Sequence, residues 1–303
     1  MITAGIYTDI PIDEYLADPC EKPSLTSELV KALTTHPPCR AWAMHPRLGN
    51  KTRPRKKEEY QDRGTAVHAI SLGYGDQVVS VDCRDWRSKE AQQMRKSAYM
   101  RGQTPMLAAD YDDAAGAAAN VAKFLPQHFE AENVVVWNDP AGPLCRCRPD
   151  AYVLPPGGGV NVWDIKTSSD VSDEACLNAI IRYRYDIQAS WHIRGLITAL
   201  RLSEIPSYRW IFVQSEPPFE ARTIDATPEF LSIADRDCSI AVQVWANALE
   251  RDSWHGYPKS KVLEYPPWAS AKAMNKHTSS AYSDNWTLMT DLLTPEELKN
   301  VSA

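Results

Sequence analysis

The sequence predicts an α/β fold in which a mixed central sheet lies between helices and follows a largely helical N-terminal part. Residues 1–130 carry mainly helical patterns. Residues 132–167 carry short β-branched or alternating segments joined by turn residues. A long helical pattern at 173–201 is then followed by two more strand patterns, at 207–215 and 219–226. Strands that alternate with helices in this way are typical of an α/β layer.

The N-terminal part shows four helical patterns, which cover residues 24–33, 58–73, 88–103 and 108–125. Between the first two, the segment THPPCRAWAMHPRLGN is expected to turn, because its prolines bar continuation of a helix. A further helical pattern follows the last strand pattern, at 227–250.

Composition narrows the possible classes of protein. The chain has 303 residues, of which 44% are hydrophobic, which is enough for one sizeable core. No apolar run is long enough to span a membrane, and the N-terminus lacks a signal-peptide pattern. Seven scattered cysteines do not suggest disulfides, so a reduced, cytoplasmic protein is expected. A net charge of −6 argues against nucleic-acid binding through bulk charge, but not against a local basic path.

The segment LCRCRPDAYVL is expected to form one strand with two different faces. Side chains alternate along a strand, so Arg146, Arg148 and Asp150 share one face and Cys145 and Cys147 the other. The cysteine face is interpreted as core, with both thiols as small buried hydrophobes. A zinc site is disfavoured because no second cysteine pair has ligand spacing.

The segment VNVWDIKTS is expected to form the next strand, reached through the turn PPGGG. This hairpin would bring Asp164 and Lys166 beside Asp150. Two neighbouring carboxylates repel each other unless a cation lies between them. Carboxylates and a backbone carbonyl, here that of Ile165, suit Mg²⁺ or Mn²⁺, which would activate water for phosphodiester hydrolysis. The plainer alternative is an Asp–Lys ion pair at a strand end.

Two further polar patterns have both a functional and a plain interpretation. Arg184, Gln188 and His192 lie on one face of the following helix pattern and either point at the metal site or form a solvated stripe. The run KTRPRKK is either a solvated loop or a loop that contacts phosphates. Its candidate DNA-binding residues are Arg53, Arg55, Lys56 and Lys57.

Four motifs in the same order resemble the PD-(D/E)XK nuclease superfamily, in its RecE-type (exonuclease VIII) and lambda-exonuclease-like branch. RPDAYVL with VNVWDIKTS resembles the metal-binding core of that family. RGTAVHA resembles its histidine-bearing helix, and YRYDIQASWH resembles its Gln-x-x-x-Tyr helix. WHGYPKSKVLEYPPWA resembles the closing segment of the RecE-type group. The resemblance covers about residues 20–269.

The resemblance implies a restriction-endonuclease-like αβα core. Residues 1–268 would form a single exonuclease domain, with a helical part at 1–130 and a catalytic core at 131–268. Residues 269–303 would be a tail that docks a partner or is flexible.

The resemblance also implies a role for each matching residue. Asp150 and Asp164 would bind the metal, with His68 as a further ligand, and Lys166 would position water and stabilise charge. Glu132 matches an acidic position of the family, and Gln188 would orient the lysine or contact substrate. His192 stands where the family usually has Tyr.

The implied activity is Mg²⁺-dependent 5′→3′ digestion of linear double-stranded DNA, which leaves 3′ overhangs for phage-type recombination. Implied partners are DNA ends, a single-strand-annealing protein and further copies of the chain in a ring, in the cytoplasm of a bacterium or a phage-infected host. DNA contacts would include Arg146, Arg148, Arg184 and His192. The alternatives are an end-independent or single-strand nuclease of this fold, and an inactive protein that binds DNA ends.

Overall fold

The structure is a computed structural model that describes residues 1–49, 59–75, 77–155, 159–260, 262, 264, 266–267 and 269–270. The chain forms two compact units, Met1–Gly256 and Tyr257–Ala303, and the first of these is described below. The basic run at 51–57, with Arg53, Arg55, Lys56 and Lys57, and nearly all of the tail at 269–303 lie outside the described residues.

A mixed five-stranded sheet forms the centre of the first unit, with the strand order β10-β9-β8-β7-β4. Its strands are β4 (Glu130–Ala131), β7 (Ala151–Val153), β8 (Asn161–Ser168), β9 (Ser207–Gln214) and β10 (Ala221–Ala226). β8 and β9 are parallel, and every other neighbouring pair is antiparallel. The predicted mixed sheet is therefore confirmed.

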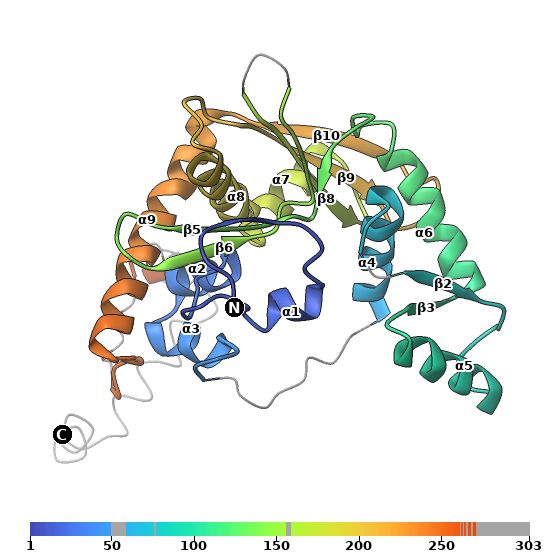
Figure 1. Ribbon diagram of the computed structural model, residues 1–303, viewed down its shortest axis with the longest axis horizontal. Helices are drawn as coiled ribbons and strands as arrows, with labels where there is room; N and C mark the ends of the chain where they lie inside the picture. Colours follow the sequence, from blue (N-terminus) through green and yellow to red (C-terminus); the bar gives the residue numbers. More distant parts are fainter. Residues whose placement is uncertain are drawn as a thin grey trace, which may run out of the picture. The chain divides into compact units, whose positions relative to one another are not determined.

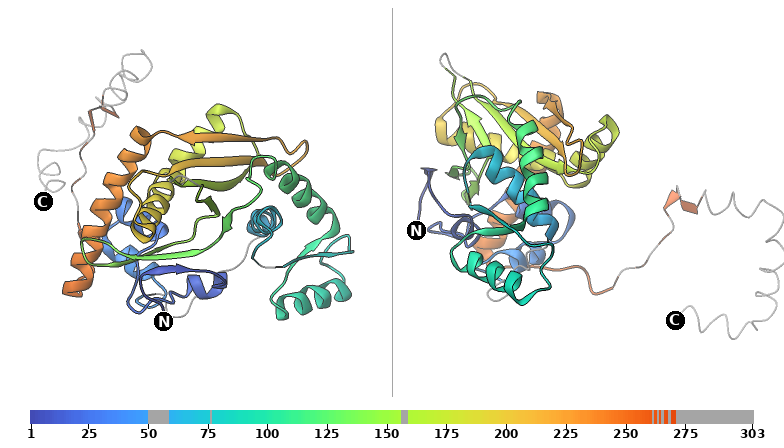
Figure 2. Two further views of the ribbon diagram at one scale, coloured as in Figure 1. Left: turned by 45° about the horizontal axis from the view of Figure 1, so that its top comes forward. Right: turned by 90° about the vertical axis from the view of Figure 1, so that its right-hand side faces the viewer.

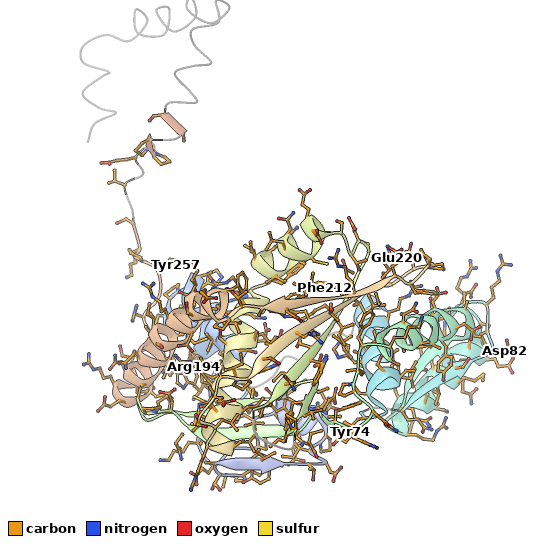
Figure 3. All side chains as sticks on the ribbon, turned by 90° about the horizontal axis from the view of Figure 1, so that it is seen from above. Tyr74, Asp82, Arg194, Phe212, Glu220 and Tyr257 are labelled. Atoms are coloured by element: carbon orange, nitrogen blue, oxygen red, sulfur yellow. The ribbon has the colours of Figure 1, made fainter. Side chains whose placement is uncertain are left out.

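Helices cover both faces of this sheet (Figures 1 and 2). One face packs against α2 (Ser27–Thr35), α7 (Asp173–Arg182), α8 (Tyr185–Leu200) and α9 (Pro228–Arg251). The other packs against α4 (Glu59–Leu72) and α6 (Ala108–Val121). Figure 3 shows Phe212 of β9 in the sheet, with Arg194 of α8 on one side of it. The arrangement is the αβα sandwich that was predicted.

The alternation of β8 and β9 explains the two cores. Val162 and Tyr208 face the core on the α8 side, whereas Trp163, Ile165 and Ile211 face the core on the α4 side. Because both faces are covered, both sets of side chains are apolar, which gives the nearly continuous hydrophobic runs seen in the sequence. Asp164 lies two positions after Val162 on the same strand, so its side chain is on the same face, the α8 side.

A second sheet, with the order β1-β5-β6, supports the first on the α8 side. It consists of β1 (Gly5–Tyr7), β5 (Val134–Asn138) and β6 (Leu144–Cys147). The expected single strand over LCRCRPDAYVL is therefore wrong: its first half is β6 of this sheet and its second half is β7 of the central sheet. Pro149 separates them, because proline has no N–H for a strand ladder. Cys145 and Cys147 are buried as expected, and all seven cysteines are free.

Two helix boundaries also differ from the sequence prediction. The long helix at 173–201 is two helices, α7 and α8, because Arg184 between them has a φ of 52°. The proline segment after α2 holds α3 (Pro38–Met44), since proline is favoured in the first turn of a helix.

Elements that the sequence analysis did not predict lie in the N-terminal half. They are β1, α1 (Ile12–Leu16) and a parallel pair, β2 (Val78–Val81) and β3 (Thr104–Leu107). This pair packs with the predicted helix α5 (Lys89–Met100). None of the helices in the described ranges combines the length and apolarity that a membrane span requires.

Candidate active site

The candidate site lies where β8 continues past the start of β7. The antiparallel register pairs Ala151 with Trp163, so the preceding Asp150 falls opposite Asp164. From Asp164 onwards, β8 is paired only with β9. The predicted hairpin geometry is therefore present, and it leaves the end of a core strand open beside two carboxylates.

Asp164 and Lys166 lie on the α8 side of β8. Asp164 is fully buried, and its Oδ2 is in ionic contact with the Lys166 ammonium. Gln188 of α8 donates a hydrogen bond from Nε2 to Asp164 Oδ1 at 3.3 Å. The helix face predicted to point at the site therefore does so at Gln188.

Asp150 is held by the backbone of β8 and by His68 of α4, which packs on the face of the sheet opposite to α8. Its Oδ2 accepts a hydrogen bond from the Ile165 N–H at 2.7 Å. His68 of α4 brings Nδ1 to 3.4 Å from the same oxygen. Helices from the two faces of the sheet, α4 and α8, thus bring polar groups to one end of β8. The structure assembles His68, Asp150, Asp164, Lys166 and Gln188 in one cluster.

The environment shifts the pKa of two groups in this cluster. Burial raises the pKa of the Asp150 carboxyl; His68 lowers it, and the nearby Asp164 carboxylate raises it further. Burial by itself lowers the pKa of Lys166, but Asp164 and Asp150 outweigh burial, and the net pKa is raised. Lys166 is therefore a cation at neutral pH. Such a group stabilises negative charge and does not accept a proton.

Tyr208 of β9 is a site residue that the sequence analysis missed. Burial and then the nearby Asp164 carboxylate raise the pKa of its hydroxyl. His192 Nδ1 lies 3.1 Å from the Tyr208 oxygen. Burial lowers the pKa of His192 to about 4, so this ring is neutral at pH 7. His192 is 2% exposed and supports Tyr208, so its interpretation as a DNA contact does not fit.

Tyr185, at the start of α8, is a second missed residue. The Lys166 ammonium lies 4.6 Å from the centre of its ring. The Lys31 ammonium of α2 lies 5.7 Å from the same centre. The sequence signal for this residue was its place three positions before Gln188, on the same helix face.

Arg146 was expected on the Asp150 face, in reach of phosphates, and the structure does not place it there. It is 3% exposed, and its Nη1 lies 2.8 Å from Asp18 Oδ1. The reason is the break at Pro149: Arg146 lies in β6 of the second sheet, whereas Asp150 directly precedes β7 of the central sheet. Arg146 is therefore a buried structural cation.

Arg184 and Arg148 are also engaged within the protein. Arg184 lies outside the helix and pairs with Asp186 at 3.0 Å and Asp237 at 2.5 Å, so it does not point at the site. Arg148 pairs with Glu132 at 2.5 Å and also donates to its backbone carbonyl at 3.0 Å. Glu132 thus neutralises the charge of Arg148. The backbone of Glu132 is left-handed at this turn, with a φ of 49°. The placements of Arg184 and Arg148 do not favour direct phosphate contact.

The donor set of the site suits Mg²⁺ better than zinc. Across the described ranges, no three His, Cys, Asp or Glu side chains converge as a ready-made metal cage. Mg²⁺ commonly takes only one or two carboxylates and keeps water and phosphate oxygens as its other ligands. Asp164 Oδ2 is buried and, although it faces the Lys166 ammonium, has no well-directed hydrogen bond among the described residues. Asp150 and Asp164 therefore fit the ion, and the Ile165 carbonyl stays a predicted ligand.

Comparisons with known proteins identify the fold. No protein-family profile matches the chain, and no curated protein sequence is significantly similar. A candidate exonuclease from Eubacterium rectale superposes with a TM-score of 0.55 at 13% identity, over 90% of this chain and 99% of that one. The fold is restriction-endonuclease-like.

Two other solved structures are similar at lower scores. A phage-related exonuclease from Haemophilus somnus has 12% identity and a TM-score of 0.33, over 76% of this chain and 96% of its own. An alkaline exonuclease from Laribacter hongkongensis has 9% identity and a TM-score of 0.27, over 76% of this chain and 93% of its own. These two scores are too low to establish a shared fold.

Proposed function

We propose that this chain is a metal-dependent exodeoxyribonuclease that digests linear double-stranded DNA from its ends. The observation that carries the proposal is the cluster at the open end of β8, where two carboxylates and a cationic lysine meet. The buried Asp164–Lys166 pair is costly to desolvate, and the second carboxylate opposite it, Asp150, adds repulsion that a purely structural strand would not need. Digestion would run 5′→3′ and leave 3′ overhangs for phage-type recombination by strand annealing.

Asp150 and Asp164 would hold Mg²⁺, with Mn²⁺ as a substitute and His68 beside Asp150 as a further ligand or orienting group. When bound, the ion would supply Lewis-acid polarisation of the phosphate and a water of lowered pKa. Lys166, a buried cation, would stabilise the negative charge that develops on the phosphate oxygens. Gln188 keeps Asp164 in position through its hydrogen bond.

The proposed assembly and partners extend this activity. A ring of several copies would keep an acidic protein on DNA by enclosing the duplex, since net charge alone would not hold it there. The exposed apolar side chains of Ile233 and Ile240 on α9 are available for contact between copies. Light scattering after size exclusion tests the oligomer. Pull-down of a single-strand-annealing protein, with and without residues 269–303, tests that partner.

The decisive experiment is digestion of linear duplex DNA labelled separately at its 5′ and 3′ ends, with Mg²⁺ or EDTA, beside a closed circular control. We expect Mg²⁺-dependent loss of the 5′ label, with the circle intact. Asp164→Asn should abolish the digestion at unchanged folding. Asp225→Asn is the matched control, because Asp225 is a strand aspartate that pairs with Arg209 on the surface, away from the site.

Other outcomes would reject the proposal in distinguishable ways. Cutting of the circle would indicate an endonuclease of the same fold. Tight binding of DNA ends without cutting, by folded protein with Mg²⁺, would indicate a DNA-end-binding protein. Digestion by Asp164→Asn at the wild-type rate would remove the site from the chemistry altogether.

A further inference from the structure

We propose that Tyr183 and Tyr185 form a stacking subsite for a nucleobase, the base of the terminal nucleotide on the strand that is degraded. The inference rests on the proposed function, because it takes the phosphate beside Lys166 as the one that is cut. It adds a contact that separates the end nucleotide from its partner strand.

The turn between α7 and α8 presents the two rings together. Arg184 has a left-handed backbone conformation, which separates the two helices and places Tyr183 and Tyr185 on either side of the turn. Its guanidinium pairs with Asp186 and Asp237, so the turn is held in place. As a result, the two ring centres are 5.7 Å apart with a 35° angle between the planes, a geometry typical of interacting aromatics.

The inner ring lies at the candidate site. Tyr185 has the Lys166 ammonium 4.6 Å from its ring centre and the Lys31 ammonium at 5.7 Å. Both cations are thereby positioned beside an aromatic surface, where a phosphate and the base attached to its sugar could be bound at once. Tyr185 would be a positioning residue for Lys166 as well as the inner wall of the subsite.

The outer ring faces solvent. Tyr183 is 53% exposed, so its ring is accessible to a ligand. The Arg182 guanidinium, itself exposed, lies 5.7 Å from its ring centre. Exposed aromatic rings combined with arginine are the surface that proteins use to bind unpaired nucleotides, because every base has a face that stacks. The row from Lys166 through Tyr185 to Tyr183 therefore runs from the site to solvent.

A nucleobase is the occupant that these features favour. The rings are flat and carry cations at both ends of the row, which matches a base flanked by phosphates. In a duplex, both faces of an internal base are covered by its neighbours, so only a base at an end is free to stack on protein. The energy of stacking on tyrosine would offset the cost of opening the terminal base pair.

The test uses duplexes that are closed by a hairpin at one end and differ at the open end, where the 5′-terminal nucleotide is normal or abasic. Binding is measured in EDTA, and kcat/KM is measured with Mg²⁺. We expect wild type to bind the abasic end about tenfold more weakly, the scale of one base–aromatic stack. Tyr183→Leu should bind both ends equally, and Tyr183→Phe should keep the preference.

Tyr99→Leu is the matched control, because Tyr99 is an exposed tyrosine with an arginine near its ring, on α5. It should keep the preference. Equal binding of both ends by wild type, an undiminished preference in Tyr183→Leu, or its loss in Tyr99→Leu would overturn the subsite. Normal Mg²⁺-dependent digestion without a base preference would reject the subsite alone. A base preference in binding without digestion would reject the proposed nuclease and support the subsite.

Discussion

Two aspartates in this protein, Asp18 (buried) and Asp150 (partly buried), have pKa values that are shifted in opposite directions. Asp18 belongs to a network near the N-terminus, and Asp150 belongs to the candidate site. Burial by itself raises the pKa of both. The final pKa of Asp18 is nevertheless lowered to about 2, whereas that of Asp150 is raised. The difference lies in how completely each carboxylate is hydrogen-bonded and paired with positive charge.

Asp18 is surrounded by donors. Its Oδ1 accepts from the Ser24 hydroxyl at 2.7 Å and from Arg146 Nη1 at 2.8 Å. Its Oδ2 accepts from the Ser24 N–H at 3.1 Å and faces His45 Nε2 at 3.1 Å. This group, the Asp18 network, connects the N-terminal segment to β6 and contains no carboxylate but its own. The hydrogen bonds and ion pairs of this network stabilise the folded state.

Asp150 has fewer donors and a like charge nearby. It accepts one backbone hydrogen bond, from Ile165, and lies beside His68 and the Asp164 carboxylate. The site therefore keeps unsatisfied negative charge, which a cation can bind. Functional sites commonly give up stability in this way. The comparison predicts that substitutions in the site change activity, and that substitutions in the Asp18 network change stability.

The largest effect should follow from Lys166→Met. Loss of the buried ammonium removes the charge that stabilises the phosphate oxygens, and we expect kcat to fall by about 10³-fold. Single-turnover digestion of a linear duplex measures this. Lys31→Met is the control, since Lys31 lies over the same tyrosine ring but makes no contact with Asp164; it should lose less than about tenfold. If Lys166→Met kept the wild-type kcat, the prediction that substitutions in the site change activity would be wrong.

Arg146→Met should lower stability and leave activity unchanged, the opposite of the result expected for Lys166→Met. It leaves Asp18 buried without its main cation, which should lower the free energy of unfolding by about 3–5 kcal/mol. Urea unfolding measures the loss, and kcat per folded molecule should not change. Arg47→Met is the control: Arg47 contacts the same carboxylate at 3.4 Å but is partly exposed, so its loss should cost at most about 1 kcal/mol. Equal losses in the two variants would contradict the assignment.

Local patterns in the sequence predicted an α/β layer with a mixed sheet and the hairpin, and the resemblance implied the αβα arrangement. Alternation along β8 and the turn after β7 were enough to bring Asp150 opposite Asp164. The same reasoning failed for Arg146, because it assumed that alternation continues through Pro149. Whether an arginine pairs with a phosphate or with Asp18, which is 128 positions away in sequence, depends on a tertiary contact that no local pattern encodes.

Helix periodicity failed at one residue for a similar reason. Nothing in the pattern marks Arg184 as a break, since arginine is a good helix former. The left-handed turn exists because Asp186 and Asp237, the latter from α9, hold the guanidinium outside the helix. Tyr208 was missed because it reads as an ordinary strand residue. Its hydroxyl lies 3.1 Å from Nδ1 of His192, the position at which the sequence resemblance led us to expect a tyrosine.

The pH dependence of stability should separate the two aspartates. The pKa of Asp18 falls from 3.8 to about 2 on folding, so its contribution is complete above about pH 4 and is lost as the pH falls towards 2. The shift corresponds to about 2–3 kcal/mol. In EDTA, the difference between the unfolding free energies of wild type and Asp18→Asn should shrink across this window.

The sign is reversed at the site. A raised pKa in the folded state means that ionised Asp150 costs stability, and this cost grows as the pH rises from the unfolded to the folded pKa. In EDTA at neutral pH, Asp150→Asn should therefore be more stable than wild type. A fall in stability for both aspartate variants, with the same pH profile, would show that the two regions do not differ in the way proposed.

The smallest effect should come from Tyr208→Phe, and it tests where the site ends. The change removes a hydroxyl that lies near the Asp164 carboxylate and 3.1 Å from His192 Nδ1, without removing the ring from the core. We expect kcat to fall about tenfold, as is usual for groups that orient a metal ligand, and stability to fall by about 1 kcal/mol.

Tyr152→Phe is the matched control for this change. Tyr152 is a buried tyrosine on β7 of the same sheet, and its hydroxyl accepts a hydrogen bond from Asn133 at 3.1 Å. It should lose similar stability and no activity. Equal loss of activity in both variants would mean that packing of the whole sheet, and not the Tyr208 hydroxyl beside Asp164, sets the rate. Loss in Tyr208→Phe alone, with weaker activation by Mg²⁺ in a titration, would extend the site from Asp164 through Tyr208 to His192.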